Sequence, residues 1–122
     1  MLALIRGAGD IASGAAMRLW HCGIDVVMTD LARPTAIRRT VAFSNAIVHG
    51  ETTVEGLRAV RAENAAEAKK LLREGSLPVL ADPECACREE LAPDALVDAI
   101  LAKRNLGTKI DDAPIVVGVG PG

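Results

Sequence analysis

A short apolar run that ends in a glycine turn constrains the fold of this chain more than any other feature. Residues 2–5 are apolar, and Gly7-Ala8-Gly9 follows them almost at once. Such a run, closed by glycine, is typical of a buried parallel strand. Residues 10–21 then place their apolar side chains on one helical face, and Gly23 stops the helix. This opening predicts a parallel sheet with helices packed against it.

The rest of the chain repeats this alternation of apolar runs and helical patterns. We expect strands at 25–29, 77–81 and 114–119, a hairpin of 52–54 and 57–60, and helices at 34–40, 64–74 and 93–105. Pro78 predicts either an edge position or a strand start for its strand, and the last strand reads as buried. The order predicts an α/β fold, with a parallel sheet covered by helices on both faces and a small β insert.

Length and composition limit the class of protein. The 122 residues suit one domain, residues 1–122, and half of them are hydrophobic. A net charge of −2, with Trp20 and Phe43 as the only aromatic residues, argues against a nucleic-acid partner. The apolar start is too short for a signal or a membrane span, and three cysteines form no disulfide framework. We expect a soluble, cytoplasmic protein, and its end in a glycine-rich loop suggests the N-terminal part of a longer one.

The glycine turn matches the dinucleotide fingerprint G-x-G-x-x-[GA] across Gly7, Ala8, Gly9, Asp10, Ile11 and Ala12. The first glycine permits the tight turn, the second lets a pyrophosphate approach the backbone, and Ala12 allows close packing of helix on strand. The N–H groups of the helix start then face the anion. The pattern predicts a nucleotide-type, phosphate-bearing ligand at this turn, and the alternative is a tight turn without a ligand.

Other residues are expected at the same edge of the sheet. Asp30 ends the second strand about twenty residues after Gly9, where a carboxylate accepts from ribose hydroxyls and favours NAD over NADP. Arg33, with Arg38 and Arg39, either holds a terminal phosphate or forms a solvated surface. A second glycine loop, with Gly118 and Gly120, follows the last strand. The Asp10 carboxylate would repel phosphate if it pointed inward, and we expect it to cap the helix instead.

Catalytic and metal-binding patterns are weak. Cys85-Ala86-Cys87 has neither the spacing nor the second pair of a structural zinc site, so we interpret these cysteines as exposed loop thiols. The sequence has no P-loop, no paired-carboxylate motif and no Ser-His-Asp order. It therefore favours binding over catalysis and identifies no catalytic residue.

Five segments resemble the YqeB-type accessory proteins of selenium-dependent molybdenum hydroxylases, and they span nearly the whole chain. They are residues 5–14 (IRGAGDIASG), 27–30 (VMTD), 38–43 (RRTVAF), 97–108 (VDAILAKRNLGT) and 112–122 (DAPIVVGVGPG). The last two are more specific than the glycine fingerprint. The resemblance implies a Rossmann-like fold related to the XdhC maturation factors and a role in maturing or inserting a molybdenum cofactor. It assigns no role to Cys85 or Cys87.

Three functions follow as expectations. A maturation factor would bind NAD or a molybdopterin-type cofactor, with a molybdenum hydroxylase or its cofactor-assembly proteins as partners; Arg6, Arg33 and Arg38 would supply positive charge. An NAD-dependent oxidoreductase would need an acid or base near the nicotinamide, and none is evident in the sequence. A ligand-sensing assembly module would bind a partner enzyme without catalysis. The sequence does not decide whether the chain forms a homo-oligomer.

Overall fold

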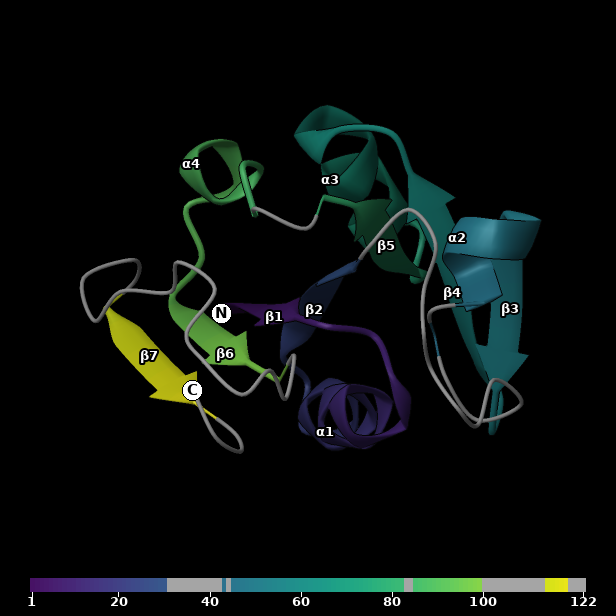
Figure 1. Ribbon diagram of the computed structural model, residues 1–122, viewed down its shortest axis with the longest axis horizontal. Coiled ribbons are helices and arrows are strands. Elements are labelled where there is room, and N and C mark those ends of the chain that lie inside the picture. Colours follow the sequence, from purple (N-terminus) through teal and green to yellow (C-terminus); the bar gives the residue numbers. More distant parts are fainter. Residues whose placement is uncertain (31–42, 44, 83–84, 100–113, 119–122) are drawn as a thin grey trace.

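The computed structural model describes residues 1–30, 43, 45–82, 85–99 and 114–118, and these form a mixed α/β fold around one seven-stranded sheet (Figure 1). The strand order is β3-β4-β5-β2-β1-β6-β7, and every neighbouring pair is parallel except the β3–β4 hairpin. The elements are β1 (Leu2–Arg6), α1 (Asp10–His21), β2 (Asp25–Asp30), α2 (Asn45–His49), β3 (Glu51–Val54), β4 (Leu57–Ala62), α3 (Ala65–Arg73), β5 (Leu77–Ala81), α4 (Arg88–Leu91), β6 (Ala95–Asp98) and β7 (Ile115–Gly118). This architecture is compatible with the expected Rossmann-like fold.

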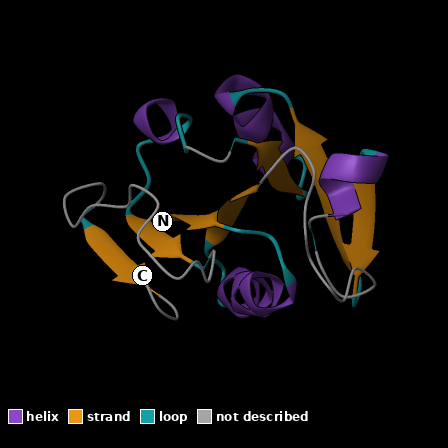
Figure 2. Ribbon diagram, viewed as in Figure 1, coloured by secondary structure: helices purple, strands orange, loops and turns teal. Residues whose placement is uncertain are grey.

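Helices lie on both faces of the sheet (Figure 2). Buried residues of α1 and α2 pack in one apolar cluster, whereas those of α3 and α4 pack in another. Neighbouring residues of β1 contribute to different clusters, Ile5 to the first and Leu4 to the second. Because successive side chains of a strand point to opposite faces, the two clusters are the two sides of one sheet.

Several local predictions are confirmed. The β3–β4 hairpin turns at Glu55 (φ 50°) and Gly56 (φ 85°), so both central residues have the positive φ of a tight hairpin turn. Asn64 caps α3, since its side-chain oxygen accepts from the Glu67 N–H at 2.8 Å. The hairpin lies at one end of the sheet and is the small β insert.

The helix predicted for residues 93–105 is wrong over its first part, because residues 95–98 form β6. This strand lies between β1 and β7, and the Asp94 N–H donates to the Leu2 carbonyl at 2.9 Å where the pairing begins. A short apolar run can be strand or helix, and here two neighbouring strands outweigh helix propensity. The single turn of α4 was not predicted, and the helix expected at 34–40 lies outside the described residues.

The structure decides between the two positions expected for Pro78 and corrects the expectation for the last strand. Pro78 does not lie on an edge, since β5 is between β4 and β2; it is near the strand start, and the pairing with β2 begins at the next residue, Val79. The last strand is not buried: Ile115 is 49% exposed and Val117 46%. The position of β7 at the end of the strand order explains this exposure.

Candidate functional site

The site expected from the sequence lies where the order of the strands reverses. From β1 the chain crosses to β2 on one side, whereas β6 and β7 lie on the other side of β1. The register sets Arg6, the last residue of β1, opposite Thr29 of β2 and Asp98 of β6. In open parallel sheets, ligands bind beyond the carboxyl ends of the strands at such a reversal. The glycine turn leaves β1 at this point.

The turn has the conformation that the fingerprint predicts. Gly7 has φ 107°, a value that side chains disfavour, and its N–H donates to the Thr29 carbonyl at 2.6 Å. Helix α1 begins at Asp10, as expected, and its first backbone bond joins the Ser13 N–H to the Gly9 carbonyl at 2.8 Å. Gly9 is the N-cap residue, so Asp10 occupies the first helical position and not the N-cap position.

Gly9 lies where the described part of the protein leaves room for a side chain, although glycine has none. Its φ of −71° suits any residue. A Cβ built on it would meet no heavy atom of the described residues within 4 Å. Neither backbone conformation nor packing within these residues accounts for a glycine here. Open space beside the backbone, at the positive end of a helix dipole, is what an approaching anion needs.

Hydrogen bonds hold the turn in place from two sides. The Asp30 Oδ2 atom accepts from the Ala8 N–H at 3.0 Å, which ties the end of β2 to the turn. The Ser13 hydroxyl, which is buried, donates to the Ala8 carbonyl at 3.3 Å and accepts from the Phe43 N–H at 2.8 Å. The turn is therefore preorganised, and a phosphate would meet the first turn of α1 rather than the Ala8 N–H.

The structure brings several of the predicted residues together. Gly7, Ala8, Gly9 and Asp30 form the turn and its support, and Ile11 is exposed in the first turn of α1. Gly118 ends β7 opposite Asp98, so it shares the carboxyl edge, two strands away from β1. Arg33, Arg38, Arg39 and Gly120, and the side chain of Asp10, lie outside the described part of the structure.

The expectation that Cys85 and Cys87 are exposed is wrong. Both are buried, 4% and 8% exposed, in the cluster on the α3 side of the sheet. Their turn follows β5 at the same carboxyl edge, and Asp82 accepts hydrogen bonds from its backbone. An aspartate shortly before a turn is a local signal for such a bond, but the burial depends on strands that are distant in sequence.

Comparisons with known proteins give one relative. No family model matches the chain. "Uncharacterized protein YqeB" from Escherichia coli (strain K12) is 54% identical over 121 residues, which are 99% of this chain and 22% of the relative. The chain thus spans about a fifth of the length of that relative. The name agrees with the YqeB-type resemblance of the sequence and states no activity.

Among the described residues, no helix combines the length and the apolar character needed to cross a membrane.

Proposed function

We propose that this chain is the ligand-binding part of an accessory or maturation factor for a selenium-dependent molybdenum hydroxylase. Its ligand would be a nucleotide or a phosphate-bearing molybdenum cofactor, bound at the Gly7-Ala8-Gly9 turn. The geometry of the turn supports the ligand class, and the resemblance of the sequence supports the role in maturation. The 54% identical relative is consistent with that resemblance.

The observation that carries the ligand class is the bare backbone at Gly9. The Cβ position is open among the described residues, and α1 starts directly after it. A phosphate seated there would approach the first helical turn without a side chain in its way. Asp30, held at the turn by its bond to the Ala8 N–H, is positioned to accept from a ribose hydroxyl.

Two matched substitutions test the site. Gly9→Ala adds one methyl where the ligand would approach, at a φ that alanine tolerates, so stability should change little. We expect affinity for NAD or for a molybdopterin dinucleotide, measured by calorimetric titration, to fall at least about tenfold, which corresponds to about 1.4 kcal/mol. Gly14→Ala adds the same methyl to an exposed position of α1, also open among the described residues. It should leave binding unchanged and raise stability by about 0.5–1 kcal/mol.

The outcome separates the proposal from its alternatives. The proposed ligand site is wrong if neither ligand binds the unsubstituted protein. It is also wrong if Gly9→Ala binds the ligand as tightly as Gly14→Ala. Oxidation of NADH with a small carbonyl substrate would favour an NAD-dependent oxidoreductase. Co-purification with a molybdenum hydroxylase, without binding of either ligand, would favour an assembly module.

A further inference from the structure

The turn after β5 buries two thiols beside a buried cation. Cys85 and Cys87 lie at the carboxyl edge of the sheet, on the face opposite α1. Arg6, only 3% exposed, and Thr29, also buried, belong to the neighbouring strands β1 and β2. Hydrogen bonds join the Cys85 thiol to the Cys87 thiol and to Thr29, and the Arg6 charge acts on Cys85. An apolar core needs neither the charge nor the pairing.

The backbone of this turn is tightly held in an unfavourable conformation. Cys85 has φ 58°, which is uncommon for any residue except glycine. The Asp82 carboxylate accepts from two N–H groups, that of Ala86 at 3.0 Å and that of Cys87 at 2.8 Å. The Arg88 N–H also donates to the Cys85 carbonyl at 3.2 Å, which closes the turn. Strained residues of this kind persist where their surroundings fix them, often at functional sites.

The surroundings divide the two thiols into different roles. The pKa of Cys85 is lowered, chiefly by the hydrogen bond from Cys87, with the Arg6 charge and the Thr29 hydrogen bond adding to it and burial and Asp82 opposing it. The pKa of Cys87 is raised, since it donates to Cys85 and is itself buried near the Asp82 carboxylate. Cys85 thus carries the more acidic thiol of the two and is the better placed to act as the nucleophile.

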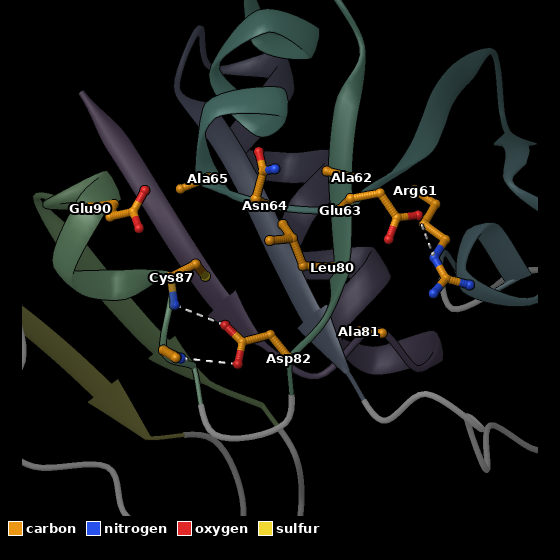
Figure 3. A pocket seen from close by; sticks show the side chains of 11 residues that line it. Arg61, Ala62, Glu63, Asn64, Ala65, Leu80, Ala81, Asp82, Cys87 and Glu90 are labelled. Carbon is orange, nitrogen blue, oxygen red and sulfur yellow. Dashed lines mark hydrogen bonds and ion pairs between the residues drawn. The ribbon is translucent and has the colours of Figure 1, made fainter.

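A pocket beside this turn reaches one of the two cysteines, Cys87. Its volume is about 320 Å³, and Asp82, Cys87, Glu90 and Asn64 are among the residues that line it (Figure 3). Cys87 therefore forms part of the wall, and its thiol is the hydrogen-bond partner of Cys85. In the described part of the chain, no group of three His, Cys, Asp or Glu side chains is placed to hold a metal ion.

We propose that Cys85 and Cys87 are a redox-active dithiol, which a small hydroperoxide entering through this pocket converts to a disulfide. The Cys85 thiolate attacks one peroxide oxygen, the O–O bond breaks, and Cys85 becomes a sulfenic acid while hydroxide or alkoxide leaves. The Cys87 sulfur then attacks the Cys85 sulfur, and the sulfenic oxygen leaves as water with the Cys87 proton. The peroxide gains the two electrons that the two thiols lose. An external dithiol then restores both thiols by exchange and is itself oxidised to a disulfide.

A variant that leaves the pair untouched gives the first test. Cys22 is exposed, so Cys22→Ser should fold normally and leave Cys85 and Cys87 as the remaining thiols. With hydrogen peroxide near neutral pH, we expect this protein to lose both thiols together, to lose two hydrogens in mass as a monomer, and to recover both with dithiothreitol. Retention of both thiols, oxidation beyond the disulfide, or disulfide-linked dimers alone would overturn the proposal.

Single substitutions in the same background assign the two roles. With Cys87→Ser we expect a sulfenic acid on Cys85, captured by dimedone. With Cys85→Ser we expect Cys87 to react at least about tenfold more slowly, because burial and the Asp82 carboxylate still raise the pKa of its thiol. Circular dichroism and Trp20 fluorescence establish that each variant is folded. Equal rates in two folded variants would show that the surroundings do not distinguish the thiols.

Discussion

The glycine turn after β1 and the cysteine turn after β5 have similar backbone features but different residues. Each leaves a central parallel strand at the carboxyl edge, and each contains a residue with positive φ, Gly7 in one and Cys85 in the other. In each turn an aspartate carboxylate accepts hydrogen bonds from backbone N–H groups. Asp30 accepts from Ala8, and Asp82 accepts from Ala86 and Cys87. The two turns lie on opposite faces of the sheet.

The difference lies in what each turn presents. The glycine turn has few side chains and leaves backbone N–H groups accessible, which suits the binding of an anion by those groups. The cysteine turn keeps its side chains, has an unfavourable φ at Cys85, and holds that thiol where the Arg6 charge acts on it. One edge of a sheet can thus carry a site made of backbone and a site made of side chains, and substitutions can test them separately.

The largest effect is expected at Gly7. Gly7→Ala places a side chain at φ 107°, where glycine alone is relaxed, so the free energy of unfolding should fall by about 3 kcal/mol. Urea unfolding followed by Trp20 fluorescence measures this. A loss below about 0.5 kcal/mol would mean that the turn relaxes readily, and the comparison with a rigid glycine turn would fail.

Asp82→Ala should lower the free energy of unfolding by a smaller amount, about 2 kcal/mol, because it removes a charged acceptor from two N–H groups of the cysteine turn. Asp94→Ala is the matched control, since the Asp94 carboxylate accepts from the exposed Leu2 N–H at 2.8 Å. Its loss should stay below about 1 kcal/mol in the same urea titration. Equal losses in the two variants would show that Asp82 does not fix the turn.

The smallest effect is a reversal at Cys85. Alanine is normally more stable than glycine in a protein, but at φ 58° the order should invert. We expect Cys85→Gly to exceed Cys85→Ala in free energy of unfolding by about 1 kcal/mol, since both variants lack the thiol and differ in backbone strain. If alanine is the more stable of the two, the cysteine turn stores no strain.

The same contrast explains how much the sequence could predict. The glycine turn was predictable because its signal, the G-x-G-x-x-[GA] pattern, lies within one short stretch of the chain. The positive φ of Gly7 and the start of α1 are as expected. Cys85 was misread because it is buried in a cluster with Leu4 and Leu96, which are distant in the sequence. Strand β6 was misread for the same reason, since pairing with β1 decides its conformation. The conformation of a turn with a local sequence pattern can be predicted from the sequence, whereas burial and strand pairing that depend on distant residues cannot.

The two-residue alternation along β1 determines which length changes the chain can tolerate. Leu4 belongs to the cluster on the α3 side and Ile5 to the cluster on the α1 side, and the Arg6 charge acts on Cys85 on the α3 side. Inserting or deleting one residue within β1 would exchange these faces, sending the guanidinium into the apolar layer beneath α1. Relatives that differ in length should therefore place their indels elsewhere, and a library of single-codon insertions should be depleted across residues 2–6.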